Sequence, residues 1–202
     1  MIPATGGVER RESEAGTADQ ADVVDSTDGL LCETNGRTVD AHPMKANGME
    51  PLRFNVFVEN PQGATTKIHH DEEKLVPVFE ESVSWPYPYA YGFVPGVVSG
   101  DGDCLDVFVI SSDPIPSGTQ LTCSAIALLE QWQNDEEDHD VLAVPSDELQ
   151  HARTIDLDEV HRKITEHIGE VFSHDPDRTL RVGELLPASA AEALVRGEKL
   201  PN

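Results

Sequence analysis

Three aspartates near the middle of the chain have the spacing D-x-D-x-x-D. They are Asp101, Asp103 and Asp106, and an apolar run typical of a buried strand, residues 107–110, follows them. Carboxylates this close repel one another unless water or a cation separates them, and the flanking glycines allow a turn that directs them to one point. Carboxylate oxygens suit hard divalent ions, and Mg²⁺ typically takes one or two carboxylates together with waters and phosphate oxygens. The spacing raises the hypothesis of a Mg²⁺ site that handles phosphate.

An acidic turn without a ligand is the alternative interpretation of the same residues, since Asp and Gly are ordinary turn residues. A calcium loop of the EF-hand type fits poorly, because it requires an oxygen ligand and a glycine where this chain has Leu105 and Asp106. A phosphatase that uses an aspartate as its nucleophile would place it where a strand ends, whereas these residues come where a strand begins.

A longer pattern surrounds the aspartates and favours the first interpretation. Residues 87–109 read YPYAYGFVPGVVSGDGDCLDVFV. This segment closely resembles the signature of the family I soluble inorganic pyrophosphatases, Y-P-x-N-Y-G-[FY]-[IV]-P-G-T, a short spacer, and D-G-D-P-[LV]-D-V-L-V. The residues that match in register, without a gap, are Tyr87, Pro88, Tyr91, Gly92, Phe93, Pro95, Gly96, Asp101, Asp103 and Asp106. The resemblance covers about residues 52–194.

The resemblance implies a fold and a chemistry. The fold is α+β and mainly β: a five-stranded closed barrel of the oligonucleotide/oligosaccharide-binding type with about two flanking C-terminal helices. The activity is Mg²⁺-dependent hydrolysis of pyrophosphate to two phosphates, in which a water that bridges two metals loses a proton and attacks phosphorus. The implied metal ligands are Asp101, Asp103, Asp106 and Asp138. Asp103 is also the implied proton acceptor, Glu59 binds substrate-associated Mg²⁺ or its water, and Lys67, Tyr87 and Tyr91 bind phosphate, with Lys67 and Tyr91 counted among the catalytic residues.

Several residues depart from the family pattern. Phe79 stands where the family has an arginine, and His69 where it has a glutamate. In the acidic loop that precedes V-L-A-V-P, Asp140 stands where the family has a lysine, and Gln133 where it has an aspartate. If the alignment of this loop shifts by one or two residues, Asp135 takes the position of that aspartate in place of Gln133. Asp175-Pro176 replaces a Tyr-Lys pair, and Arg178 or Arg181 nearby is a candidate to compensate.

These departures make the pocket more negative than the family pattern, and the leaving phosphate needs cations where its charge develops. Two hypotheses therefore remain open. The first is a pyrophosphatase that is slower than its relatives or has a changed phosphorylated substrate. The second is a pseudoenzyme that binds a divalent ion or phosphate in a regulatory or binding role.

The chain is strongly acidic, with 38 Asp and Glu residues against 14 Lys and Arg residues and a formal charge of −24. This charge argues against nucleic acid and anionic membranes as partners, because both require basic surfaces. Prokaryotic members of the family assemble, so a homo-oligomer is an open alternative, but no interface can be identified in the sequence.

The charge also predicts adaptation to a salt-rich cytoplasm, because an acidic, lysine-poor surface repels itself unless salt screens it. We expect the thermal midpoint to rise from dilute buffer to multimolar salt, and thermal denaturation over that range is the measurement. A protein that is most stable in dilute buffer would contradict this halophilic interpretation.

Cysteine usage and hydropathy indicate the compartment. The three cysteines, Cys32, Cys104 and Cys123, form no CxxC motif, so neither a disulfide framework nor a zinc site is indicated. The sequence has no basic-then-apolar leader and no apolar run long enough for a membrane span, so a cytoplasmic protein is the expectation.

The elements that must position these residues follow from periodicity. Residues 1–48 lack periodicity, which predicts an acidic, mostly flexible extension with one short hairpin within residues 29–40, and residues 49–202 form the barrel domain. Strands are predicted at residues 52–58, 73–80, 105–110, 121–129 and 141–144, with a loop at 85–96 in which Trp85, Tyr89 and Phe93 pack. Capping boxes at Asp156/Glu159 and Ser189/Glu192 predict two helices.

Overall fold

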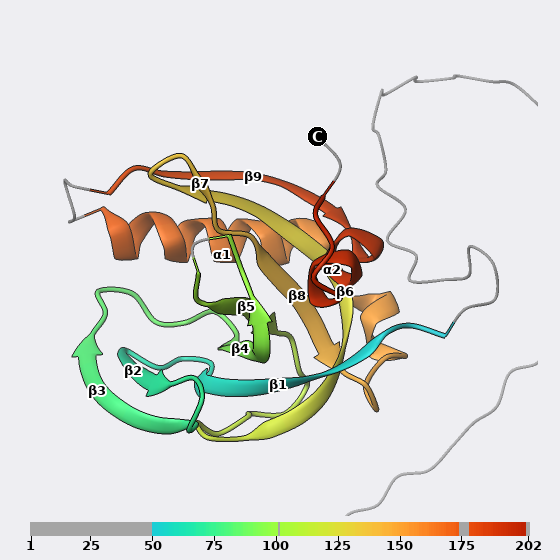
Figure 1. The fold of residues 1–202 in the computed structure, drawn as a ribbon, viewed down its shortest axis with the longest axis horizontal. Helices are drawn as coiled ribbons and strands as arrows, with labels where there is room; N and C mark the ends of the chain where they lie inside the picture. The colour runs from blue at the N-terminus through green and yellow to red at the C-terminus, as the bar shows by residue number, and fades with distance from the viewer. Residues whose placement is uncertain (1–49, 101, 174–177, 201–202) are drawn as a thin grey trace, which may run out of the picture. The chain divides into compact units, whose positions relative to one another are not determined.

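Five strands close on themselves into a β-barrel (Figure 1). This computed structural model describes residues 50–100, 102–173 and 178–200. Around the barrel the order is β1 (Arg53–Asn60), β4 (Ala90–Val98), β5 (Cys104–Val109), β8 (Asp140–Pro145) and β6 (Gln120–Gln133). Strand β6 pairs with β1 to complete the ring, and every barrel pair is antiparallel except β5 with β8. The predicted fold class, a mainly β, closed five-stranded barrel, is confirmed.

The remaining elements cover or extend the barrel. Strands β7 (Glu136–Glu137) and β9 (Leu180–Pro187) both pair with β6, and β2 (Thr66–Asp71) and β3 (Val76–Ser82) form a separate two-stranded ribbon. A 3-10 turn, His151–Thr154, precedes helix α1 (Leu157–Phe172), and α2 (Ala188–Val195) follows β9. In the part of the chain that is described, no helix has the length and hydrophobicity to cross a bilayer.

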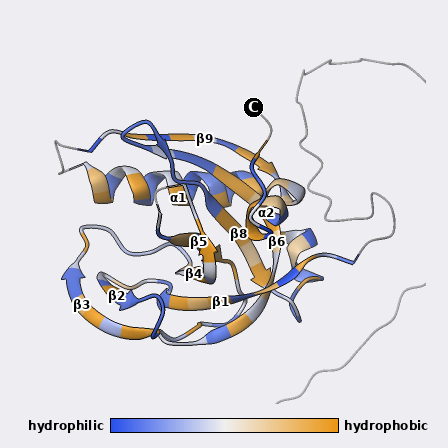
Figure 2. Ribbon diagram, viewed as in Figure 1, coloured by the Kyte–Doolittle hydropathy of each residue, from blue (hydrophilic) through white to orange (hydrophobic). Residues whose placement is uncertain are grey.

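Two groups of buried side chains stabilise this arrangement. Alternate residues of β1, namely Phe54, Val56 and Val58, point into the barrel, where they join apolar residues of β5 and β8. Residues of the opposite faces, among them Phe108 and Leu142, pack beneath α1. Figure 2 accordingly shows β5 and β8 as predominantly hydrophobic and α1 as mixed. Residues 107–109 of β5 and 141–144 of β8 are buried on both faces of the sheet, and these stretches are continuous apolar runs.

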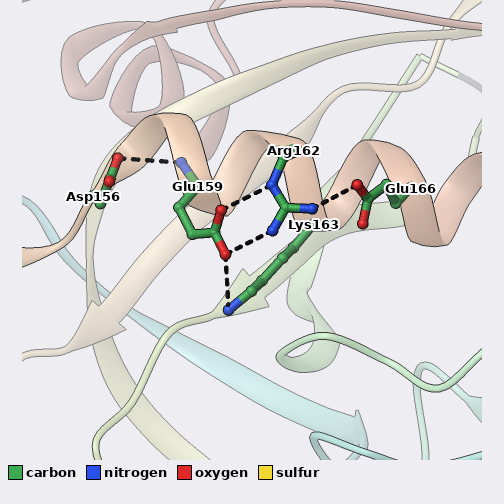
Figure 3. A network of polar contacts seen from close by, with 5 residues as sticks. All are labelled: Asp156, Glu159, Arg162, Lys163 and Glu166. Carbon is green, nitrogen blue, oxygen red and sulfur yellow. Dashed lines mark hydrogen bonds and ion pairs between the residues drawn. The ribbon is translucent and has the colours of Figure 1, made fainter.

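Helix α1 begins at the predicted cap. The Asp156 side chain accepts a hydrogen bond from the Glu159 amide, which satisfies one of the free N–H groups of the first turn. On the exposed face, Arg162 bridges Glu159 and Glu166, and Lys163 also contacts Glu159 (Figure 3). These pairs are spaced three and four residues apart, so they offset part of the acidic charge of the helix.

Several sequence-based expectations need correction. The segment predicted as a loop at residues 85–96 becomes strand β4 from Ala90 onward, because its second half pairs with both β1 and β5. The predicted strand at 73–80 begins only at Val76, after a turn. The capping box at Ser189 is wrong, since Pro187 is the N-cap and makes no side-chain cap. Trp85 does not pack as expected but is 45% exposed, whereas Phe93 is buried. Residues 1–48, including the hairpin at 29–40, lie outside the described residues.

Candidate active site

Strand β4 and the segment before it place two tyrosines near Asp106 of β5. Tyr91 lies opposite Phe108 of β5, and its hydroxyl donates a hydrogen bond to the Asp106 carboxylate. Tyr87, just before β4, is buried and stacks against Tyr91 at a ring distance of 5.4 Å. Burial and the nearby carboxylates raise the pKa of both hydroxyls, so both stay protonated and act as hydrogen-bond donors.

Asp106 lies next to a second acid, Asp140, across the parallel strands β5 and β8. The strands pair Val107 with Val141, so the preceding residues stand side by side at the same end of the barrel. Burial raises the pKa of Asp106 to about 8, and the charge of Asp138 adds to the shift. Burial also raises the pKa of Asp140 well above its usual range, and Asp106 is the largest charge that adds to this shift. The buried carboxylate of Asp140 and the partly buried carboxylate of Asp106 therefore share a site that favours a proton or a cation.

Asp138 belongs to the same group of acids. It influences the pKa of both Asp106 and Asp140, and its carboxylate accepts a hydrogen bond of 2.9 Å from Gln131. Asp135, in contrast, lies with Asn134 in an exposed left-handed turn between β6 and β7. Asp138 therefore lies close to Asp106 and Asp140, as a shared role requires. Asp135, the alternative to Gln133 for the other family aspartate, lies in the exposed turn, and its role stays a prediction.

Glu59, at the end of β1, is held by His70 of β2. One carboxylate oxygen, Oε1, lies 3.1 Å from the His70 amide nitrogen and 3.2 Å from its Nδ1. Burial raises the pKa of Glu59, while His70 and Lys67 oppose the shift. The neighbouring Asn60 accepts a hydrogen bond from the Ile68 amide, so β1 and the β2–β3 ribbon are joined at the candidate site.

Lys67 on β2 is a cation that acts on three of these acids. It lowers the pKa of Glu59, Asp106 and Asp140 and so opposes the effect of burial at all three. Asp103 is exposed and directly precedes β5, with its carbonyl accepting a hydrogen bond from the Ser99 amide. Asp101 lies outside the described residues, as do Asp175 and Pro176.

The donor chemistry fits a hard cation, although the cage is incomplete. Across residues 50–100, 102–173 and 178–200, no group of three or more His, Cys, Asp or Glu side chains is placed to hold a metal ion. The adjacent carboxylates of Asp106 and Asp140 nevertheless supply the oxygen ligands that Mg²⁺ prefers, and their mutual repulsion would be relieved by a cation. The oxygen donors therefore fit Mg²⁺ better than they fit zinc, which favours nitrogen and sulfur ligands.

Comparison with known proteins decides the family. Residues 56–197 match the family model described as inorganic pyrophosphatase. The chain belongs to the inorganic pyrophosphatase family. It is 30% identical to the inorganic pyrophosphatase of Aeropyrum pernix over 154 residues, which span 72% of this chain and 88% of that one. It is 31% identical to soluble inorganic pyrophosphatase 1 of Arabidopsis thaliana over 176 residues, or 82% of each chain. Among solved structures, the pyrophosphatase from Coxiella burnetii aligns with a TM-score of 0.65 and 26% identity over 72% of this chain and 92% of that one.

Two histidines outside the motif support the candidate site, and the sequence pattern did not predict them. His70 binds Glu59, and the buried ring of His167 on α1 contacts Tyr87 and lies 3.1 Å from the Pro86 carbonyl oxygen through its Nδ1. Burial lowers the pKa of His167 to about 4, so the neutral ring donates to this carbonyl and fixes the start of the tyrosine segment. These contacts join residues 11 and 81 positions apart, and no local pattern signals them.

The two arginines suggested as replacements for the missing Tyr-Lys pair contact aromatic rings. The Arg181 guanidinium lies 3.3 Å from the centre of the Trp132 ring, and that of Arg178 lies 5.4 Å from the centre of the Phe172 ring. Such contacts use the faces of the guanidinium groups. A role for either residue in binding phosphate stays a prediction.

Proposed function

We propose that this protein hydrolyses inorganic pyrophosphate to two phosphates with Mg²⁺ as its cofactor. The observation that carries the proposal is the meeting of one lysine, two protonated tyrosines and several carboxylates at one end of the barrel. Family membership supports the reaction, because the matched relatives are named as inorganic pyrophosphatases.

Each residue has a role in this proposal. The Mg²⁺ ligands are Asp101, Asp103, Asp106 and Asp138. Lys67, Tyr87 and Tyr91 bind the phosphates, since each presents N–H or O–H donors, and Glu59, oriented by His70, takes Mg²⁺ that arrives with the substrate. Asp103 accepts the proton of the attacking water, a role that suits a carboxylate exposed to solvent. Bound Mg²⁺ would lower the pKa of water and stabilise charge on the phosphate oxygens.

A second candidate function rests on the charge of the candidate site. Asp140 stands at a position where the family has a lysine, and Phe79 where it has an arginine, so Lys67 faces an excess of carboxylates. A catalytically impaired protein that binds a divalent ion or phosphate in a regulatory role would have these features. A protein that hydrolyses pyrophosphate slowly would be intermediate between the active enzyme and the pseudoenzyme.

Phosphate release from pyrophosphate, measured in high salt with and without Mg²⁺, separates the two. We expect turnover only with Mg²⁺, and we expect Asp103→Asn to reduce it by about 100-fold or more, since general-base catalysis alone contributes typically 10²–10⁴-fold. Asp135→Asn, an acid in the exposed turn, is the matched control and should keep full activity. If the unaltered protein binds Mg²⁺ in a calorimetric titration but releases no phosphate, the pseudoenzyme is the correct description.

A further inference from the structure

The β2–β3 ribbon presents four side chains on one face. Lys67 lies opposite Glu81, and His69 lies opposite Phe79. Residues directly opposite each other in an antiparallel pair point to the same side, and so do residues two apart along a strand. One face of the ribbon therefore carries Lys67 and, about 7 Å further along, the His69–Phe79 pair.

This face looks onto the candidate active site. Lys67 acts on Glu59, Asp106 and Asp140, and the Glu81 carboxylate is close enough to raise the pKa of Tyr87. Glu81 in turn lies 2.9 Å from Nε2 of His69 through its Oε1. A continuous series of contacts therefore leads from the acids and tyrosines to the aromatic pair.

His69 and Phe79 form a flat platform. Their rings are stacked with centres 4.0 Å apart and planes inclined by 12°, and Glu81 fixes the outer nitrogen of the imidazole. Phe79 is nevertheless 54% exposed, so much of this aromatic surface contacts solvent. An exposed, oriented aromatic surface beside a lysine is suited to a ligand that combines a planar ring with an anionic group.

We propose that His69 and Phe79 form a stacking subsite for the base of a nucleoside diphosphate whose diphosphate group is bound by Lys67. One sugar separates base and phosphate in such a ligand, and Glu81 at the edge of the platform can accept hydrogen bonds from sugar hydroxyl groups. The proposal rests on the function proposed above, because the same residues would hold the phosphoanhydride. Hydrolysis would form one P–O bond to water, break the bond from the terminal phosphorus to the bridging oxygen, and release a nucleoside monophosphate, inorganic phosphate and a proton.

The test compares two probes, adenosine diphosphate and inorganic pyrophosphate, by calorimetric titration of the full chain with Mg²⁺ in high salt. The quantity compared is the affinity for adenosine diphosphate divided by the affinity for pyrophosphate. We expect Phe79→Ala to lower this ratio by about tenfold, which is within the range measured for base stacking on aromatic side chains. Phe79→Tyr should restore the ratio, whereas Phe79→Leu should not. Val78→Ala is the matched control, since Val78 is a 63% exposed, non-aromatic residue directly next to Phe79 in the same strand.

The other outcomes separate failure of the subsite from failure of the proposed function. An equal loss of affinity for both probes, or the same effect from Val78→Ala, would mean that the rings do not bind the base. If Phe79→Ala changes the oligomeric state in size-exclusion chromatography and leaves the affinity ratio unchanged, the platform is a protein contact. Hydrolysis of pyrophosphate together with no binding of the nucleotide refutes the subsite and leaves the proposed function intact. Nucleotide binding that depends on Phe79, without turnover of either probe, refutes the proposed hydrolysis but supports the subsite.

Discussion

Asp106→Asn is expected to reduce Mg²⁺-dependent phosphate release by at least about 100-fold, since losing only the outer partners of a metal ligand costs about 10–100-fold. The same change should stabilise the metal-free protein at high pH. Asp106 and Asp140 lie side by side in a partly desolvated site, where the charge of Lys67 opposes theirs. Asparagine keeps the size of the side chain and removes one of the two charges. Phosphate release and denaturant unfolding in a chelator are the two measurements.

The pH dependence follows from the direction of the shift. The folded-state pKa of Asp106, about 8, is above the value of 3.8 for an unperturbed aspartate, so the folded state binds the proton more tightly. The stability that this group contributes is therefore complete below about pH 4 and is lost as the pH rises through about 8. At pH 9 we expect the asparagine variant to be more stable than the unaltered protein by on the order of 2 kcal/mol, and at pH 4 the difference should vanish.

Mg²⁺ and a second variant provide the controls. Mg²⁺ should raise the thermal midpoint of the unaltered protein at pH 8 more than that of the Asp106 variant, because ligands that bind only the folded state stabilise it. Asp135→Asn removes an exposed acid and should change neither quantity. An Asp106 variant that loses stability at pH 9 without metal would refute the repulsion between the two acids.

Gly92→Ala is expected to destabilise the barrel by more than about 3 kcal/mol, at or above the upper end of ordinary overpacking. Gly92 on β4 pairs with Val58 on one side and Val107 on the other. A Cβ atom there would lie 1.9 Å from the carbonyl oxygen of Phe57 and 2.9 Å from the Val58 Cα atom. Since both are backbone atoms, relief requires separating β1 from β4, which carry Glu59 and Tyr91 of the candidate site. Denaturant unfolding, together with phosphate release, is the measurement.

Gly169→Ala is the matched control for that change. Gly169 is exposed on α1, and an added Cβ would meet no atom within 4 Å. Alanine in the interior of a helix is about 0.5–1 kcal/mol more favourable than glycine, so this variant should be slightly stabilised. If both variants had the same stability as the unaltered protein, the close approach of β4 to β1 would be refuted.

The local sequence predicted the elements whose signals are local. The Asp156 cap and the spacing of Val160, Ile164 and Ile168 placed α1, because an N-cap and a helical period involve only nearby residues. The apolar runs at 105–110 and 141–144 predicted buried strands correctly. The residues that became β4 were misjudged, because proline, glycine and tyrosine favour a loop locally, while pairing with two neighbouring strands overrides that preference.

The sequence by itself determined the family, through a gapless motif, and with it the barrel and the candidate acids, because residue type and spacing carry that information without reference to space. Only the tertiary structure decided which residues meet. It placed Asp140 beside Asp106 across a parallel pair, brought His70 to Glu59, and stacked His69 on Phe79, so that two separate departures from the family pattern became one aromatic surface. These three contacts depend on the register of the strands and on the closure of the barrel. Each joins residues that share no pattern along the chain.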